Sequence, residues 1–360
     1  MDLNKFYIEN IKKCFSLAKK GGLNVLPNPL VGCVITDKNN NTISTGYHKK
    51  FGSFHAEREA ILKADDKKLK GAILYVNLEP CSHYGKTPPC ADLIIEKKIK
   101  KVVFSMKDPN IKVNGEGVKK LKEAGIEVVE GILENEAKEL NKVFIKNITK
   151  NIPYIALKTA VTLDSKIATN TFNSKWITNE KSRLEVMKLR SSYQAIMTGS
   201  NTVLLDNPHL TSRIEGGINP IRIIMNREGR LKIRSNVFKN DGTRIIVIDN
   251  TDRKYPKRIE KIPFKNMKTL LKTLYDMGIY SILIEAGLNL NSAFIKEKAV
   301  DEIYQFIAPK ILGGGINFVS KLDPIRISDC ILTKDMKIKK FDDDILLNYK
   351  LVYDKKGENI

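Results

Sequence analysis

One histidine and two cysteines are spaced in the chain as ligands of a catalytic zinc ion are. His55 opens the stretch His-Ala-Glu, and Cys81 and Cys90 each follow a proline. A histidine and two thiolates give zinc three protein ligands and leave the fourth position open for water. Zinc lowers the pKa of that water, which makes hydroxide available at neutral pH. The three residues therefore predict a hydrolytic zinc centre.

Glu57 is the carboxylate that this chemistry needs beside the metal. It lies two residues after His55. Residues two apart on a helix point in different directions, so Glu57 can reach the water and shuttle a proton without being a ligand. His-x-Glu followed by Pro-Cys and a second cysteine is the signature of zinc nucleobase deaminases. The spacing departs from that signature, because eight residues rather than two separate Cys81 from Cys90.

Each part of this signature is weak alone, since a buried cysteine usually behaves as a small hydrophobic residue. The order of the surrounding elements strengthens it. The hydrophobic pattern predicts a strand, its hairpin partner, a helix from His55 and a strand leading into Cys81, at 31–36, 42–48, 55–64 and 72–78. Zinc is therefore the favoured interpretation. The remaining cysteines lack partners at ligand spacing and are predicted to be core residues: Cys14, Cys33 and Cys330.

The whole chain alternates between helical and strand patterns. A first helix is expected over 4–22, ended by Gly21 and Gly22, and a single helix over 134–148 closes the first part. From about Asn151 a second series of strands and helices begins. The chain therefore predicts two α/β domains, at 1–146 and 147–360.

Composition supports this organisation and limits the function. A chain of 360 residues favours two domains over one, at roughly 150 residues each. No apolar run is long enough to cross a membrane, and the charged N-terminus lacks a signal core. We expect a cytoplasmic protein with reduced thiols. The net charge of +21 comes mostly from dispersed lysines, so small phosphorylated anions are favoured and nucleic acid is not expected as a partner.

Several motifs in the first part resemble the bifunctional pyrimidine deaminase/reductase of riboflavin biosynthesis. They are, in order, NPLVGCVI, GYH, HAEREA, NLEPCSHYGKTPPC and DPN. The eight residues between the two cysteines are also what that family has. The resemblance implies a cytidine-deaminase-like three-layer α/β/α fold. It places the zinc ligands at His55, Cys81 and Cys90, and the proton shuttle at Glu57.

The same resemblance implies substrate contacts in this domain. The family deaminates a diaminopyrimidinone that carries a ribosylamino 5′-phosphate. Asn28 matches an asparagine that contacts substrate in this fold, and an amide suits a ribose or base edge. An Asn-Pro turn is the alternative. The loop between the cysteines offers phosphate contacts at His83, Lys86 and Thr87. A solvated loop lysine is the alternative for Lys86.

Motifs in the second part resemble the reductase half of the family from residue 153 to beyond 315. That half has a dihydrofolate-reductase-like fold and uses NADPH to reduce the ribosyl side chain to ribityl. Its substrate contacts fall on Ser174, Arg190, Leu210, Arg213 and Glu285. Its cofactor contacts fall on Ala160, Trp176, Thr202, Asp206, Gly287, Leu288, Asn289, Leu290, Asn291, Ser292 and Ala293. The two arginines suit a phosphate, and the N-terminus of a helix after Gly287 can accept one as well.

Further residues of this half stand close to the expected sugar site. Lys158 and Asp164 flank it, and Lys158 is a candidate for proton delivery, with a strand lysine facing solvent as the alternative. For Arg190 the alternative is a favourable charge at a helix C-terminus. The family often has glycines before its Trp-Ile-Thr, whereas this chain has Asn-Ser-Lys. We also expect a homo-oligomer.

Two other functions remain open from the sequence. One is a cytidine or tRNA-base deaminase with an unrelated second domain, which the long loop between the cysteines disfavours. The other is a nucleic-acid-binding protein with a structural zinc, which needs a fourth protein ligand. His83 is the candidate for that ligand.

The loop between the cysteines generates a first prediction. Replacing Lys86 by alanine is expected to raise the KM of deamination for the phosphorylated substrate, because an ammonium group that contacts the phosphate is lost. Steady-state kinetics checks this. An unchanged KM would exclude the phosphate role of Lys86.

Overall fold

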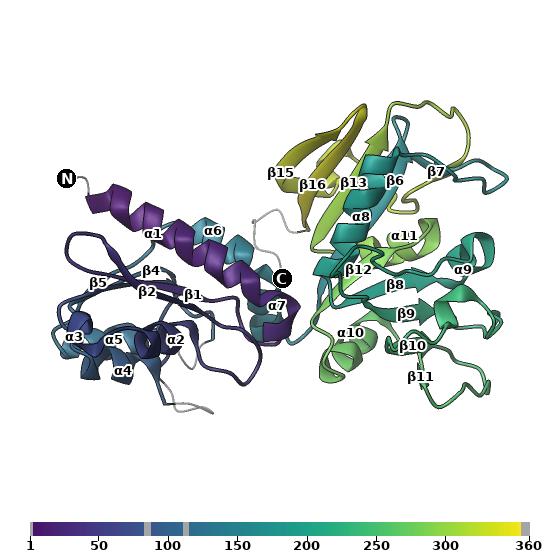
Figure 1. Ribbon diagram of the computed structural model, residues 1–360. Coiled ribbons are helices and arrows are strands. Elements are labelled where there is room, and N and C mark those ends of the chain that lie inside the picture. The colour runs from purple at the N-terminus through teal and green to yellow at the C-terminus, as the bar shows by residue number, and fades with distance from the viewer. Residues whose placement is uncertain (1–2, 83–87, 111–114, 354–360) are drawn as a thin grey trace. The chain divides into compact units, whose positions relative to one another are not determined.

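The chain divides into two compact units after Asn151, just beyond the end of the last helix of the first unit. They comprise Met1–Asn151 and Ile152–Ile360 (Figure 1). The computed structural model describes residues 3–82, 88–110 and 115–353. The division lies slightly beyond the boundary expected from the sequence, because the last helix of the first unit, α7 (Lys142–Lys150), continues to Lys150.

A five-stranded sheet forms the centre of the first unit. Its order is β2-β1-β3-β4-β5, and the strands are β1 (Gly32–Thr36), β2 (Thr42–Tyr47), β3 (Ile73–Leu78), β4 (Lys101–Met106) and β5 (Glu127–Val129). The β1 strand is antiparallel to β2 and β3. The pairs β3–β4 and β4–β5 are parallel. The carboxyl ends of β3 and β4 therefore lie at the same edge of the sheet.

Helices cover both faces of this sheet, as the strand alternation requires. On one face, Ile11 and Cys14 of α1 (Leu3–Ala18) pack against Val34 and Tyr75. On the other face, the neighbouring strand residues, such as Cys33, face α2 (Ala56–Lys63), α4 (Cys90–Glu96) and α5 (Glu116–Glu123). The short α3 (Asp66–Leu69) precedes β3. The unit is a three-layer α/β/α sandwich (Figure 1).

Two helices differ from their predicted extents. The first ends at Ala18 and continues as the 3₁₀ segment η1 (Lys19–Val25), within which Gly22 has a φ of 53°. The helix expected over 134–148 is two helices, α6 (Glu134–Leu140) and α7, separated at Asn141. The Asn141 amide accepts from Leu30 N at 2.8 Å and donates to Leu30 O at 3.1 Å. This tertiary contact breaks a pattern that is helical throughout.

The second unit is built on a nine-stranded sheet of order β11-β10-β9-β8-β12-β6-β13-β16-β15. The strands from β11 to β13 are parallel, whereas β16 is antiparallel to both of its neighbours. Their bounds are β6 (Tyr154–Thr162), β8 (Ala195–Gly199), β9 (Ile221–Met225), β10 (Ile245–Ile248), β11 (Ile259–Ile262), β12 (Ser281–Glu285), β13 (Glu302–Ala308), β15 (Leu332–Phe341) and β16 (Asp344–Val352). The parallel strands end at a common edge.

Both faces of the large sheet are also covered. Leu270 of α10 (Met267–Asp276) and Phe294 of α11 (Leu288–Lys296) belong to the core on one face. Val203 of α9 (Ser200–Asp206) packs with η2 (Asn236–Phe238) on the other face. Val186 of α8 (Glu180–Ser192) packs there against β13 and β16.

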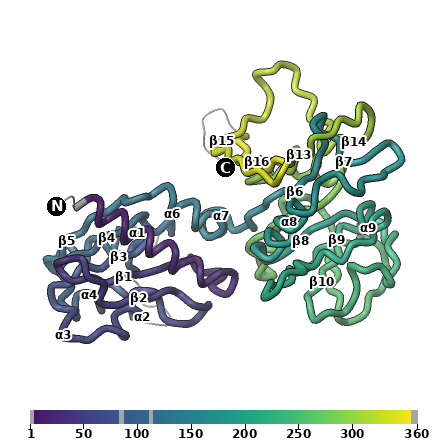
Figure 2. Tube along the Cα trace, turned by 45° about the horizontal axis from the view of Figure 1, so that its top comes forward, coloured from purple at the N-terminus to yellow at the C-terminus, as the bar shows by residue number. Residues whose placement is uncertain are grey.

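The C-terminal strands are the main part of the fold that the sequence analysis missed. The β15–β16 hairpin extends the sheet beyond β13, and Figure 2 shows it at the yellow end of the chain. A two-stranded ribbon, β7 (Lys166–Ala168) with β14 (Ile316–Asn317), and the short η3 (Ile327–Asp329) were also not foreseen. Cys14 and Cys33 are buried as predicted, but Cys330 is exposed, so its assignment to the core was wrong. No helix in the described ranges is both long and apolar enough to span a membrane.

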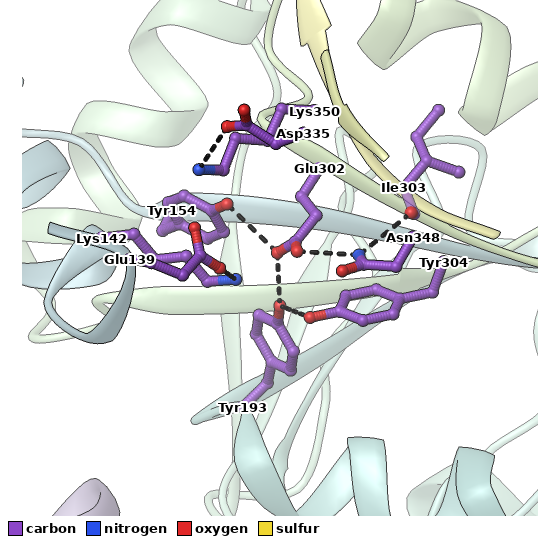
Figure 3. A network of polar contacts seen from close by, with 10 residues as sticks. All are labelled: Glu139, Lys142, Tyr154, Tyr193, Glu302, Ile303, Tyr304, Asp335, Asn348 and Lys350. Atoms are coloured by element: carbon purple, nitrogen blue, oxygen red, sulfur yellow. Dashed lines mark hydrogen bonds and ion pairs between the residues drawn. The ribbon is translucent and has the colours of Figure 1, made fainter. Parts of the chain in front are cut away.

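A buried carboxylate at the start of β13 connects several strands of the second unit (Figure 3). Glu302 is 2% exposed. It accepts hydrogen bonds from the hydroxyl of Tyr154 at 3.1 Å, the hydroxyl of Tyr193 at 3.4 Å and the amide of Asn348 at 2.8 Å. These bonds connect β6, β13 and β16 to the segment before β8. Burial raises the pKa of Tyr193, which keeps this donor protonated.

Replacing Glu302 by leucine is expected to destabilise the second unit by about 2–4 kcal/mol, because buried donors lose their acceptor. Urea unfolding followed by circular dichroism measures the loss, and hydrogen exchange should locate it in β6 and β13. Glu302→Gln is the matched control, since it retains one acceptor oxygen and should be less destabilised. A leucine variant as stable as the wild type would contradict the role of this network.

Candidate functional site

The three predicted zinc ligands converge on one point. His55 Nδ1 lies 3.5 Å from the sulfur of Cys81 and 3.5 Å from that of Cys90, and the ligand atoms all lie within 4.8 Å of one another. Such separations suit a tetrahedral ion with bonds of about 2.0–2.3 Å. Among the residues that the structure describes, no fourth histidine, cysteine or carboxylate joins the group. The donor set therefore fits zinc with one position left for water.

The three ligands are positioned by the ends of helices and strands. His55 caps the N-terminus of α2, and Cys90 is the first residue of α4. Cys81 follows β3 through Pro80, and its sulfur accepts a hydrogen bond from the backbone N–H of Cys90 at 3.3 Å. The positive end of a helix dipole favours a thiolate. The backbone N–H of Cys90, at the start of α4, thus stabilises a thiolate at Cys81.

The charges within the cluster are mutually supporting. A hydrogen bond from the Cys90 thiol, together with the nearby His55, lowers the pKa of Cys81. In turn, the hydrogen bond with Cys81 raises the pKa of His55 to about 9. The site therefore favours a thiolate at Cys81, which is the form that binds zinc.

Glu57 lies on the first turn of α2, next to the cluster and outside the ligand set. Only 3% of the residue is exposed. Burial raises the pKa of its carboxyl group to about 7. A carboxyl group whose pKa is close to neutral can both take and give a proton, which is the role predicted for it.

Asn28 is oriented by a residue to which the sequence analysis gave no role. The Asn28 amide nitrogen lies 3.1 Å from His48 Nε2, and His48 Nδ1 lies 3.0 Å from the Phe54 carbonyl oxygen. That carbonyl can only accept, so the ring proton belongs on Nδ1 and Nε2 accepts from the amide. The Asn28 oxygen is then left for other partners. The stretch Gly-Tyr-His, which contains His48, was the available signal.

Glu79 is a second residue that the sequence analysis missed. Its buried carboxylate accepts from the backbone N–H groups of Asp108, Gly115 and Val118 at 3.3, 3.1 and 3.3 Å. A side chain at Gly117 would lie 2.1 Å from the Pro80 carbonyl oxygen, so only glycine allows α5 to approach this closely. The turn that carries Cys81 is therefore fixed against the segment that follows β4. The predicted phosphate contacts of His83, Lys86 and Thr87 lie outside the described residues.

In the second unit, cationic side chains surround Glu285 at the carboxyl end of β12. Arg190 of α8 donates to both carboxylate oxygens, from Nε at 2.6 Å and from Nη2 at 2.8 Å. Lys158 on the neighbouring strand β6 is paired in register with Glu285, and its ammonium lies 3.9 Å from the carboxylate. Burial alone would raise the pKa of Glu285, but the charge of Arg190 and its hydrogen bonds lower it.

Lys158 and Asp164, which were expected to flank the sugar, differ in their surroundings. The Lys158 side chain is 16% exposed, so it does not face solvent, and burial lowers its pKa. The carboxylate of Asp164 accepts from Thr162 Oγ1 at 2.6 Å and from the N–H groups of Leu312 and Gly313 at 3.1 and 2.8 Å. These bonds lower the pKa of Asp164 to about 2. Asp164 therefore stays ionised and fixes a loop.

The remaining predicted substrate residues lie in two loops. Leu210 is buried and Arg213 exposed in the segment after α9, both with positive φ. The charge of Arg190 adds to partial burial in lowering the pKa of Arg213, which places the two guanidinium groups near each other. Arg213 makes no hydrogen bond or ion pair with the residues described, whereas Arg190 is held by Glu285. Ser174 lies half-buried in the loop before Trp176.

The predicted cofactor residues gather at the same edge of the sheet. Gly287 caps α11 without a side-chain hydrogen bond, so the first N–H groups of this helix are available for a phosphate. A Cβ at Gly287 would lie 4.0 Å from Thr202 Oγ1, and one at Gly199 would lie 4.0 Å from Leu290. The starts of α9 and α11 are therefore adjacent, which suits a pyrophosphate. The stretch from Leu288 to Ala293, including Asn289 and Ser292, forms the first turns of α11.

The other cofactor residues lie around this edge. Ala160 is on β6. Asp206 is the last residue of α9, and its Oδ1 lies 3.9 Å from Nζ of Lys175. Trp176 is 64% exposed. The Asn291 amide donates to Phe318 O at 3.1 Å, but its buried oxygen has no partner within the described ranges. A buried amide oxygen without a partner among the described residues and an exposed indole both suit contact with a ligand, and the residues present fit a dinucleotide.

Comparison with known proteins accounts for both units. Residues 6–106 match the cytidine and deoxycytidylate deaminase zinc-binding region, and residues 153–347 match the RibD C-terminal domain. The second match contradicts the alternative of an unrelated second domain. It also covers β13 and most of the C-terminal hairpin that the sequence analysis left without a motif.

Relatives match over nearly the full chain. The riboflavin biosynthesis protein RibD of Aquifex aeolicus is 40% identical over 97% of this chain and 99% of its own. The Escherichia coli protein of the same name is 35% identical over 93% of this chain and 97% of its own. A deaminase/reductase structure from Thermotoga maritima has a TM-score of 0.88 at 40% identity, covering 97% of this chain and 99% of that one.

These matches agree with the geometry of the two sites. They confirm both predicted fold classes, the deaminase and reductase activities, and zinc and NADPH as the cofactors. With a zinc-ligand cluster in the first unit, a cationic and glycine-lined edge in the second, and relatives at 35–40% identity over almost the entire length, the chain belongs to the RibD family of riboflavin biosynthesis proteins.

Proposed function

We propose that the chain carries out two consecutive steps on one phosphorylated pyrimidine. The first is hydrolytic deamination of 2,5-diamino-6-ribosylamino-4(3H)-pyrimidinone 5′-phosphate in the unit up to Asn151. The second is reduction of the ribosyl chain in the unit from Ile152, giving 5-amino-6-ribitylamino-uracil 5′-phosphate. The observation that carries this proposal is the convergence of His55, Cys81 and Cys90 beside a buried Glu57.

In the deamination site, His55, Cys81 and Cys90 would hold the zinc ion. When bound, zinc lowers the pKa of a coordinated water and so supplies the nucleophile at neutral pH. Glu57, which is buried on the first turn of α2 beside the ligands, would take a proton from the attacking water and give one to the departing amino group. Asn28, held by His48, offers its amide oxygen to the substrate. His83, Lys86 and Thr87 bind the phosphate.

In the reduction site, bound NADPH would supply the hydride that reduces C1′ of the sugar. Arg213 binds the 5′-phosphate, since its guanidinium is exposed, and Arg190 adds positive charge while being held by Glu285. Glu285 orients sugar hydroxyl groups, and Ser174 and Leu210 line the substrate position. Lys158 delivers the proton when the ribose ring opens, because burial lowers its pKa and so favours proton release.

The cofactor is bound along the edge formed by β6, β8 and β12. Backbone N–H groups of the first turn of α11, from Leu288 to Leu290, would bind its pyrophosphate, because the N–H of Asn291 already donates to Gly287 O within the helix. Thr202 and Asp206 of α9, Ala160 of β6 and the exposed indole of Trp176 form the remaining contacts.

We further propose a cytoplasmic homo-oligomer that has no nucleic acid partner. The exposed side chains of Leu332, Met336 and Ile338 on the terminal strand β15 support association between copies, because large apolar groups at an open sheet edge favour burial.

The experiment that tests the two-site assignment uses Glu57→Gln. This variant is expected to bind zinc as the wild type does and to release no ammonia, because an amide cannot carry the proton. It should still oxidise NADPH when it is given the deaminated nucleotide. Metal analysis, an ammonia assay and absorbance of NADPH provide the three readouts.

Glu59→Gln is the matched control on the same helix. Glu59 is also buried but pairs with Lys49 and Lys63, so its loss should leave ammonia release largely intact. A Glu57→Gln protein with full deaminase activity would show that the acid–base assignment is wrong.

A further inference from the structure

The loop that carries Trp176 is poorly held by core packing. Trp176 is 64% exposed and Phe172 is 53% exposed. Hydrogen bonds within the loop are local, such as that from Asn173 N to Thr169 Oγ1 at 3.1 Å. The position of the indole therefore depends on the contacts that the loop makes with other elements.

Two cationic side chains that lie outside the loop, those of Lys310 and Arg183, contact it. The ammonium group of Lys310 donates to the carbonyl oxygens of Trp176 at 2.9 Å and Ile177 at 2.8 Å. The Arg183 guanidinium of α8 lies 4.5 Å from the centre of the indole ring, and its Nη1 donates to Thr178 O at 2.8 Å. Of these two residues, Lys310 is the one that bonds to the backbone of Trp176 itself, and it thus positions the main-chain atoms from which the indole extends.

The backbone of Lys310 is itself fixed. It follows β13, and its carbonyl oxygen accepts from Leu163 N at 2.8 Å. Two and three residues later, the N–H groups of Leu312 and Gly313 donate to the carboxylate of Asp164. Leu163 and Asp164 follow β6, which lies beside β13 in the sheet. The central strands therefore fix the backbone of Lys310. Through its ammonium group, the lysine in turn holds the Trp176 loop in place relative to the sheet.

We propose that Lys310 is a positioning residue for the reductase step. Its ammonium group holds the backbone of Trp176 and Ile177 so that the indole is kept ready to contact NADPH. This inference rests on the proposed function, in which Trp176 is a cofactor contact. Lys310 is itself exposed, and exposed charged groups add little to fold stability. Its removal should free the loop and leave the sheet intact.

Trp176 provides its own probe, because the chain has 1 tryptophan. Its fluorescence is titrated with NADPH in the zinc-loaded full-length enzyme, and its anisotropy decay is recorded without NADPH. Three proteins are compared with the wild type: Lys310→Met, Lys310→Arg, and Lys268→Met. Lys268 is an exposed residue of α10 that makes no hydrogen bond or ion pair with the described residues, so its variant is the matched control.

For Lys310→Met we expect the Kd for NADPH to rise about tenfold, because two charge-assisted hydrogen bonds that order the loop are lost. The indole should also move more freely in the anisotropy decay. The KM for NADPH should rise in parallel, while kcat at saturation changes by less than about twofold, since Lys310 does not touch the substrate. Lys310→Arg should restore most of the affinity, because a guanidinium can also donate to two carbonyl oxygens. Ammonia release, which depends on the first unit, should be unchanged in every variant.

The outcomes separate this inference from the function on which it rests. If NADPH does not alter the emission of the wild-type protein, the contact between Trp176 and the cofactor is wrong and the inference falls with it. If the wild type responds and Lys310→Met has the same Kd and anisotropy decay, Lys310 has no positioning role although the reductase assignment stands. The inference would likewise be overturned if Lys268→Met lost as much affinity for NADPH as Lys310→Met, or if Lys310→Arg did not restore that affinity.

Discussion

Parallel strands that end at one edge of a sheet are the constraint on which both sites depend. In the first unit, Cys81 follows β3, and the segment bound by Glu79 follows its parallel neighbour β4. In the second unit, Glu285 ends β12, and Gly199 ends β8 beside it. Residues that are far apart in sequence are thereby brought together without a long loop. The exposed carboxyl ends of parallel strands are where α/β proteins commonly bind ligands.

The two sites use buried carboxylates in opposite ways. Glu57 is buried without a cation bonded to it, so burial raises its pKa to about 7 and the group can exchange protons near neutral pH. Glu285 is less deeply buried, with a side chain that is 10% exposed, and it is held by Arg190 and lies near Lys158, so its pKa is lowered and it stays an anion. The first environment suits general acid–base catalysis, and the second suits fixed orientation of a polar substrate. Burial acts to raise the pKa of both carboxyl groups, and the cations beside Glu285 reverse that effect.

The sequence predicted the parts of each site that depend on residue type and local order. His55, Glu57, Cys81 and Cys90 were found because zinc ligation limits which residues can serve and hydrophobic periodicity located the elements around them. The positioning residues were not found. His48, Glu79 and Lys310 act on backbone groups or amides that only the folded chain brings near, and such contacts leave no spacing rule. The break at Asn141 was missed for the same reason, since Leu30, its partner, is distant in sequence. The β15–β16 hairpin was missed because every residue of β15 except Phe341 is exposed, so no buried face marks the strand.

The account's central claim is that one chain performs deamination first and reduction second, at separate sites. The most direct test supplies the diaminopyrimidine nucleotide to the zinc-loaded enzyme with and without NADPH, and follows ammonia and NADPH together. Ammonia should appear at the same rate in both reactions, and NADPH oxidation should begin only after a lag in which the deaminated nucleotide forms. Oxidation of NADPH without prior ammonia release, or ammonia release that requires NADPH, would contradict the account.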